Sequence, residues 1–341
     1  MSILNNNNVF IVAELSANHL HQIDLAIKTI HEIKKAGADA VKIQTYTPDT
    51  LTIDCENDCF KATKGTLWEG KTLYELYKEA YTPWDWHEKL KKEAESLDLV
   101  FFSTPFDKSA VDFLENLGIS IYKIASCEIT DIHLIRYIAS KQKPVIISTG
   151  IATLTDIEEA VTTCKNVGNY DLALLKCTSS YPTPYEEVNL KTIPHLAATF
   201  DITTGISDHT LGIGVPIAAA ALGAKIIEKH FIIDRNLGGP DAAFSLEPHE
   251  FGQMVTSVRE VEKALGSITY NLSEMMKKGR QFARSLFVVE DMRCGDIFNT
   301  SNVRSIRPAN GLHPRFLNDI IGRRASQNIQ RGTPLSWSLV C

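Results

Sequence analysis

Short apolar runs alternate with longer amphipathic segments along the first two thirds of the chain. The apolar runs lie at 9–14, 40–44, 100–103, 121–124, 144–148, 172–176, 202–205 and 225–228. Apolar residues recur at helical spacing near 22–36, 84–97, 107–117, 131–140, 155–166, 189–199 and 214–222. Strands that alternate with helices are typical of a parallel sheet, and strands that are apolar throughout indicate burial on both faces.

The number and length of these strand–helix units predict an α/β fold, a single (β/α)8 TIM barrel. A doubly wound open sheet is the alternative, but no glycine-rich dinucleotide-binding motif follows the first strand. One unit carries a long insertion at 45–80. Long insertions of this kind usually form a lid or a wall of the substrate site, and we expect one of these roles here.

The pattern changes after the barrel. A closing helix is predicted at 249–265 and ends at Gly266. Short strands with turn residues then follow at 284–289, 294–296, 302–307 and 331–333. We therefore predict a barrel domain over 1–270, a linker over 271–282 and a small, mostly β domain over 283–341.

Composition and charge narrow the class of protein. The chain has 341 residues, 44% of them hydrophobic, and a net charge of -6, which is ordinary for a globular protein and gives no basic field for nucleic acid. Its seven cysteines fit free thiols in a reducing cytoplasm, and Cys55 and Cys59 form only a weak pattern for a metal or a disulfide. The chain contains no run of about 18 apolar residues, which is the length needed to span a membrane. We expect a cytoplasmic protein with neither a membrane nor a nucleic-acid partner.

Polar residues collect where the predicted strands end, which is where barrel enzymes place their active sites. They are Glu14, Asn18, His19, Lys42, Gln44, Thr45, Ser103, Thr104, Lys123, Ser126, Glu128, Ser148, Thr149, Lys176, Thr178, Ser179, Ser207, Asp208, His209, Glu228 and His230. Lys42 and Lys123 lie inside strands, and a buried lysine needs a partner of opposite charge. Two ammonium groups among several hydroxyls predict a site for phosphate or carboxylate.

Two histidines stand in matching places at the ends of the last two strands. A lone histidine there is most simply a turn residue or a hydrogen-bonded core residue. His209 and His230 would meet in a closed barrel, however. Imidazole is the commonest protein ligand for divalent metals from the middle of the first transition series. Glu14 is a candidate general acid or base. The residues alone thus predict a metal-assisted barrel enzyme that acts on a small anionic, phosphorylated substrate.

The same residues lie in motifs that resemble the sialic acid synthase family. The motifs are Ala13-Glu-Leu-Ser-Ala-Asn-His19, Lys42-Ile-Gln-Thr45, Ser103-Thr-Pro-Phe106, Lys123-Ile-Ala-Ser126, Ser148-Thr-Gly150, Ser207-Asp-His-Thr210, Glu228-Lys-His-Phe231 and Gly239-Pro-Asp241. Arg307-Pro-Ala-Asn-Gly311 resembles the antifreeze-like, or SAF, domain that these enzymes carry. The resemblance implies a TIM barrel followed by a small β-clip domain of the SAF type.

The resemblance also implies a reaction and its residues. Members of this family condense phosphoenolpyruvate with an open-chain, N-acetylated amino sugar, giving a nine-carbon 2-keto sugar acid and phosphate. The positions that hold phosphoenolpyruvate are Lys42, Lys123, Ser126, Ser148, Ser179 and Ser207, and those that bind the sugar are Gln44, Glu128, Tyr181, Asp241 and Arg307. Glu14 matches the catalytic carboxylate. A divalent metal, usually Mn2+ with Mg2+ or Co2+ as alternatives, would lie between His209 and His230. Arg307 would reach the barrel of the other subunit in a domain-swapped homodimer.

Departures from the family pattern point to one branch of it. Ser179 stands where the N-acetylneuraminate synthases have asparagine. The segments Cys177-Thr-Ser-Ser-Tyr-Pro182, Gln44-Thr-Tyr-Thr-Pro-Asp49, Leu73-Tyr-Glu-Leu-Tyr77 and Gly311-Leu-His-Pro314 resemble the branch that makes pseudaminic acid, whose acceptor is 2,4-diacetamido-2,4,6-trideoxy-L-altrose. Synthesis of N-acetylneuraminate or legionaminic acid is the alternative. A non-catalytic protein that binds carbohydrate or ice is a remote one.

Overall fold

The chain is described here from a computed structural model that covers residues 8–62 and 65–341. It divides into two units, Met1–Gly266 and Ser267–Cys341. No helix within the described ranges is long and apolar enough to span a bilayer.

The first unit is a closed barrel of eight parallel strands in chain order, which confirms the predicted TIM barrel. The strands are β1 (Phe10–Glu14), β2 (Ala40–Thr45), β3 (Val100–Pro105), β4 (Tyr122–Ile124), β5 (Val145–Ser148), β6 (Leu172–Cys177), β7 (Thr203–Asp208) and β8 (Ile226–His230). The barrel closes between β1 and β8. Glu14, the last residue of β1, pairs with Lys42 on one side and with His230 on the other. Closure thus places the ends of the first and last strands at the same level of the barrel.

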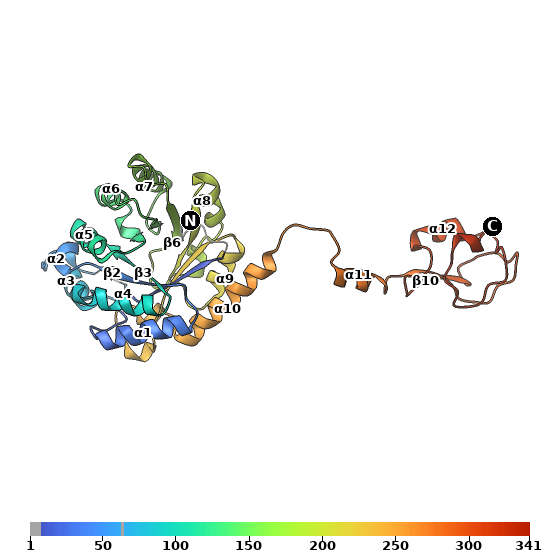
Figure 1. Cartoon of the computed structure of the whole chain (residues 1–341), viewed down its shortest axis with the longest axis horizontal. Coiled ribbons are helices and arrows are strands. Elements are labelled where there is room, and N and C mark those ends of the chain that lie inside the picture. The colour runs from blue at the N-terminus through green and yellow to red at the C-terminus, as the bar shows by residue number, and fades with distance from the viewer. Residues whose placement is uncertain (1–7, 63–64) are drawn as a thin grey trace. The chain divides into compact units, whose positions relative to one another are not determined.

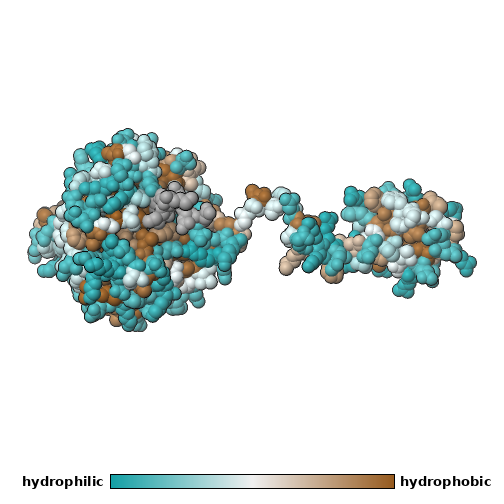
Figure 2. Space-filling model, in the orientation of Figure 1, coloured by the Kyte–Doolittle hydropathy of each residue, from teal (hydrophilic) through white to brown (hydrophobic). Residues whose placement is uncertain are grey.

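Helices surround the barrel (Figure 1). They are α1 (Ile23–Lys35), α4 (His87–Ser96), α5 (Lys108–Leu117), α6 (Ile132–Ala139), α7 (Leu154–Asn166), α8 (Thr192–Phe200), α9 (Gly214–Ala221) and α10 (Pro248–Leu265). Each buries an apolar stripe against the strands; in α1, for example, Ala26, Ile30 and Ile33 are fully buried. The outward surface of this unit is mainly hydrophilic on the face shown in Figure 2. The helices therefore supply the outer half of the core, and the strands are buried on both sides.

The described part of the insertion at 45–80 contains α2 (Pro48–Leu51), a 3-10 helix at Asp58–Phe60 and α3 (Leu73–Ala80). The backbone N–H of Glu75 donates a hydrogen bond to the side chain of Thr72, and the backbone N–H of Thr72 donates one to the Glu75 carboxylate, so a capping box fixes the start of α3. The backbone of Lys61 forms an antiparallel β-bridge with that of Thr72. These local contacts hold the described parts of the insertion in a defined structure.

The second unit has its own apolar core, built around a two-stranded antiparallel sheet of β9 (Ser285–Val288) and β10 (Val303–Ile306). It also contains α11 (Glu274–Arg280), in the predicted linker, and α12 (Leu317–Ile320). The strands expected at 294–296 and 331–333 are wrong, because both segments are turns flanked by single β-bridges. Gly295 has a φ of +88°, a value that suits a turn rather than a strand.

Candidate active site

The barrel interior changes from apolar to polar toward the carboxyl ends of its strands. Successive side chains of a strand point to opposite faces, so every second residue points inward. The inward residues nearer the amino ends form an apolar floor of Phe10, Val12, Ala40, Phe102, Ile121, Ile146, Ala173, Leu175 and Ile226. Two positions further along five of these strands stand Glu14, Lys42, Lys123, Ser148 and Glu228, and all five are buried. A polar layer thus lies directly above the apolar floor.

Four charged side chains of this layer form one ion cluster. Lys42 Nζ lies 2.6 Å from Glu14 Oε2 and 3.6 Å from Glu228 Oε1. Lys123 Nζ lies 3.8 Å from the same oxygen of Glu228. Each charge has an opposite charge within 4 Å, which is the condition for keeping such groups out of water.

Burial and pairing set the protonation of this cluster. Burial raises the pKa of Glu14, although Lys42 opposes the shift. Burial would raise the pKa of Glu228 too, but Lys123 and Lys42 hold it below its usual value. Glu14 is therefore the more easily protonated of the two carboxyl groups, as a general acid requires.

Serine hydroxyls surround the lysines. Lys123 Nζ donates a hydrogen bond of 2.7 Å to Ser148 Oγ, and Ser207 Oγ donates one of 3.1 Å to Glu228 Oε1. Ser179 Oγ is buried and has no hydrogen-bond partner among the described residues. A buried hydroxyl without a partner costs free energy unless a ligand or water takes its hydrogen bond. The serine hydroxyls around the lysines can therefore form hydrogen bonds with an oxygen-rich ligand.

Gly150 allows two of these hydroxyls to converge. Its backbone N–H donates a hydrogen bond of 3.0 Å to Ser126 Oγ. A Cβ atom at this position would lie only 2.3 Å from Ser179 Oγ and 2.7 Å from Ser126 Oγ. Any side chain here would push the serines apart, so the close approach requires glycine.

The two predicted histidines lie side by side. His209 directly follows β7, His230 ends β8, and their ring centroids are 5.4 Å apart. His230 Nδ1 is buried without a hydrogen-bond partner in the described part of the chain, and Asp241 Oδ2 lies 3.5 Å from it. Burial, and next the neighbouring His209, lower the pKa of His230 well below its usual value. His230 is therefore neutral, which is the form of imidazole that binds metals.

This pair fits a divalent metal that is only partly coordinated by protein. The unpartnered nitrogen of His230 could provide one ligand atom, and the neighbouring ring of His209 could provide a second. Residues 8–62 and 65–341 contain no group of three or more histidine, cysteine or carboxylate side chains arranged for a metal. A cation here would leave several coordination positions for water and substrate oxygens, as catalytic metals do.

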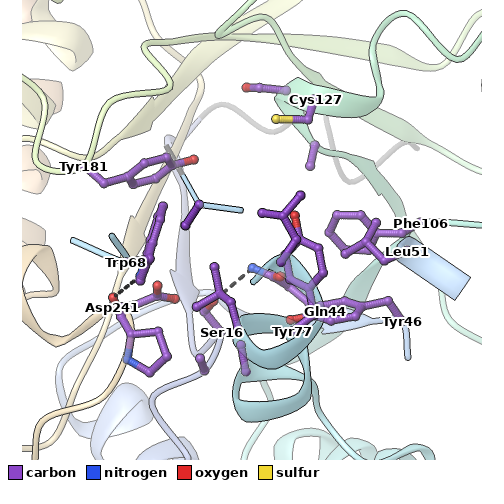
Figure 3. A pocket seen from close by; sticks show the side chains of 18 of the residues that line it. Ser16, Gln44, Tyr46, Leu51, Trp68, Tyr77, Phe106, Cys127, Tyr181 and Asp241 are labelled. Atoms are coloured by element: carbon purple, nitrogen blue, oxygen red, sulfur yellow. Dashed lines mark hydrogen bonds between the residues drawn. The ribbon is translucent and has the colours of Figure 1, made fainter. Parts of the chain in front are cut away.

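A cavity of about 350 Å³ has His230 among its lining residues. Figure 3 shows this cavity with Gln44, Tyr181 and Asp241 around it. The predicted sugar-binding residues Gln44, Glu128, Tyr181 and Asp241 line it, together with Ser126. A volume of this order holds a small ligand. Five of the predicted residues therefore share one cavity with His230.

Gln44 joins the cavity to the ion cluster. Its Nε2 donates hydrogen bonds of 3.0 Å to Glu14 Oε1 and 2.9 Å to Ser16 Oγ. Glu128 also lines the cavity, and burial raises its pKa to about 7. At neutral pH the Glu128 carboxyl is partly protonated, so it can both donate hydrogen bonds to a sugar and accept them.

The insertion at 45–80 forms one wall of this cavity. Trp68 lines it, donates a hydrogen bond of 3.1 Å to the carbonyl of Pro240, and packs its ring 5.7 Å from that of Tyr181. Tyr74, in contrast, donates a hydrogen bond to Asp49 within the insertion. The insertion is held against the barrel loops, in the place where a substrate wall was expected.

Three predictions about individual residues need comment. Asp208 and Lys229 precede the two histidines but alternate to the outer face, where their charged groups lie 2.5 Å apart and Lys229 is fully buried, so they form a structural ion pair. Arg307 belongs to the second unit and is exposed on it. Glu228, which lies within 4 Å of both lysines, was expected among the polar residues at the strand ends but was given no role. Its position two residues before His230, on the same face of the strand, was the available signal.

Comparisons with known proteins agree with this architecture. Residues 29–270 match the NeuB family, and residues 283–340 match the SAF domain. The chain belongs to the NeuB family. The predicted resemblance to the sialic acid synthases and their SAF domain is confirmed.

Named relatives within the NeuB family differ in their product. The chain is 46% identical to the pseudaminic acid synthase of Campylobacter jejuni, over 97% of this chain and 96% of the relative. It is 39% identical to the N,N'-diacetyllegionaminic acid synthase of Legionella pneumophila, over 96% of this chain and 93% of the relative. A crystal structure of N-acetylneuraminic acid (sialic acid) synthetase from Leptospira borgpetersenii, in complex with citrate, is 34% identical, with a TM-score of 0.71 over 80% of this chain and 91% of that one.

Proposed function

We infer that this chain is a transferase that condenses phosphoenolpyruvate with 2,4-diacetamido-2,4,6-trideoxy-L-altrose, forming pseudaminic acid and phosphate. The observation that carries this inference is the identity of 46% over almost the whole chain with a pseudaminic acid synthase. Identity to the legionaminic acid synthase is lower over the same span. The segments that depart from the N-acetylneuraminate pattern favour the same branch.

The ion cluster is suited to hold phosphoenolpyruvate. We propose that Lys42 and Lys123 bind its anionic groups, and that hydroxyls such as Ser148 and Ser179 accept and donate hydrogen bonds around them. The apolar floor beneath excludes water from one side. In such a water-poor site each charge–charge contact is stronger than in solution.

Glu14 is suited to move a proton. It lies 2.6 Å from Lys42, and burial raises its pKa. Attack of the enol carbon 3 on the acceptor aldehyde turns the aldehyde oxygen into a hydroxyl, which needs a proton, and water must later add at carbon 2 before phosphate leaves. We propose that Glu14 donates the proton to the aldehyde oxygen. Gln44 would fix the orientation of the Glu14 carboxyl group through the 3.0 Å hydrogen bond.

We propose that His209 and His230 hold a divalent cation, with Mn2+ as first choice and Mg2+ or Co2+ as alternatives. Such a cation would supply a Lewis acid that polarises the acceptor aldehyde. Asp241, Tyr181 and Glu128 would hold the body of the sugar in the cavity beside it. A cytoplasmic location is part of the proposal, supported by seven cysteines that are free thiols.

Product mass tests the choice of sugar. The purified enzyme is incubated with phosphoenolpyruvate, Mn2+ and one acceptor at a time: the diacetamido-trideoxy-L-altrose, N-acetylmannosamine, or the legionaminic acid precursor. We expect stoichiometric phosphate and the mass of pseudaminic acid with the first acceptor, and product formation at least about tenfold slower with the other two. Faster turnover of either other acceptor would move the chain to that branch.

We also propose a domain-swapped homodimer in which Arg307 completes the active site of the other subunit. The second unit has its own core, and Arg307 is exposed on it, as a residue donated to another subunit must be. Mixing inactive Arg307→Ala subunits with inactive Glu14→Ala subunits should restore about a quarter of wild-type activity, because half of randomly formed dimers contain one intact site of two.

A matched mixture controls this experiment. Glu14→Ala and Lys42→Met both alter the barrel, so mixing these two variants should restore nothing. Absence of recovery in the Arg307 mixture, with heterodimers confirmed by mass spectrometry, would refute donation of Arg307 between subunits.

A further inference from the structure

One end of the active-site cavity is apolar. Leu51, Leu73, Leu76 and Phe106 line it, and none of their side chains can form a hydrogen bond. Figure 3 shows Leu51 and Phe106 together, on the side of the cavity away from Asp241. An unmodified sugar presents a hydroxyl on nearly every carbon, and burying a hydroxyl against such a wall without a partner is costly. The wall therefore suits a part of the ligand that carries no hydroxyl.

The apolar end is preformed rather than loose. Leu76 is buried within α3, whose start is fixed by its capping box. Tyr46 and Tyr77 also line the cavity, and the buried ring of Tyr46 contacts Phe106 and Tyr77 edge to face, at centroid distances of 5.1 Å and 5.8 Å. Aromatic packing of this kind holds the lining side chains in place before the ligand arrives.

The opposite end of the cavity fixes the direction of the acceptor. Its aldehyde carbon must meet phosphoenolpyruvate, which the proposed function places at the ion cluster and the histidine pair. His230 and Asp241 mark that side, with 3.5 Å between Nδ1 and Oδ2. Carbon 6 is the other end of the open chain and therefore points to the apolar side.

We propose that Leu51, Leu73, Leu76 and Phe106 form a subsite for the methyl group at carbon 6 of the acceptor, and that this subsite selects 6-deoxy over 6-hydroxy sugars. The proposal rests on the proposed function and specifies which residues choose its substrate. Because an apolar pocket rejects a ligand with one added hydroxyl only moderately, the expected preference is about 10- to 100-fold in kcat/KM.

Two acceptors that differ only at carbon 6 provide the test. The wild-type enzyme is assayed with 2,4-diacetamido-2,4,6-trideoxy-L-altrose and with its 6-hydroxy analogue, at saturating phosphoenolpyruvate and Mn2+. We expect the deoxy sugar to be preferred about 10- to 100-fold. In Leu51→Asn and Leu73→Asn, which place an amide in the wall at nearly constant volume, the preference should fall below about threefold, mainly because kcat/KM for the deoxy sugar drops.

Leu67→Asn is the matched control, since Leu67 lies in the same insertion, is 50% exposed and does not line the cavity. Its preference should equal that of the wild type. Equal turnover of both acceptors by the wild type, a result that needs no variant to fold, would overturn the subsite while leaving the proposed function intact. An unchanged preference in both folded wall variants would overturn it as well. Turnover of neither acceptor would overturn the proposed function and the subsite together.

Discussion

His209→Ala and His230→Ala should each abolish metal-dependent release of phosphate from phosphoenolpyruvate, with a loss in kcat on the order of a thousandfold or more. In the proposed site these two imidazoles are the protein ligands of the cation, so either substitution would remove half of them. The measurement is phosphate release with the acceptor present, before and after chelation and after adding back Mn2+, Mg2+ or Co2+ to the wild type. The three ions should restore wild-type activity and leave both variants inactive.

His195→Ala controls for the loss of an imidazole as such, because His195 is exposed on α8. It should retain wild-type activity and the same response to chelation. Metal binding can be followed without turnover, by titrating Mn2+ into each protein and recording its paramagnetic resonance signal. Full activity of both histidine variants after chelation would refute the metal site.

Lys42→Met should cost both catalysis and stability. The substitution removes the ammonium group that lies 2.6 Å from Glu14 and 3.6 Å from Glu228, and it leaves buried carboxylates less compensated. Removing one partner of a buried ion pair typically destabilises a protein by about 3–5 kcal/mol. Activity should fall below detection, and the free energy of unfolding, measured with urea, should fall by that amount.

A second substitution separates the two effects. In the double variant Lys42→Met/Glu14→Gln the carboxylate charge is removed as well, while Glu228 keeps Lys123 as a partner at 3.8 Å. Most of the lost stability should return, and activity should remain absent. Lys35→Met, which breaks only an exposed pair with Glu32, should change neither quantity appreciably. If the double variant is as unstable as the single one, the cluster is not held together by these charges.

The fold was predictable because the strands are apolar on both faces. Apolar runs separated by helical periodicity gave the order of the barrel and the positions of all eight strands. Their carboxyl ends were predicted less well: β7 and β8 were expected to end at 205 and 228, whereas they continue to Asp208 and His230. Polar side chains buried in the barrel mouth interrupt the apolar pattern where the site begins, so a hydrophobicity pattern places these strand ends too early.

The site was predictable as a set of strand ends but not as a set of contacts. Glu228 illustrates the limit. A glutamate near the end of a strand usually meets solvent, and only the register of the closed barrel reveals that it lies between Lys42 and Lys123. The second unit had weaker signals, because its chain is held by single bridges and turns that have no periodicity to detect.

The division of labour between strands and insertion has an evolutionary consequence. The ion cluster and the histidine pair stand on barrel strands or directly after them, whereas the apolar wall of the cavity comes mainly from the insertion after β2. Mutations in that insertion can change the apolar end of the cavity without displacing Lys42, Lys123, His209 or His230. A lineage with this barrel can diversify the sugars it elongates while inheriting one reaction unchanged.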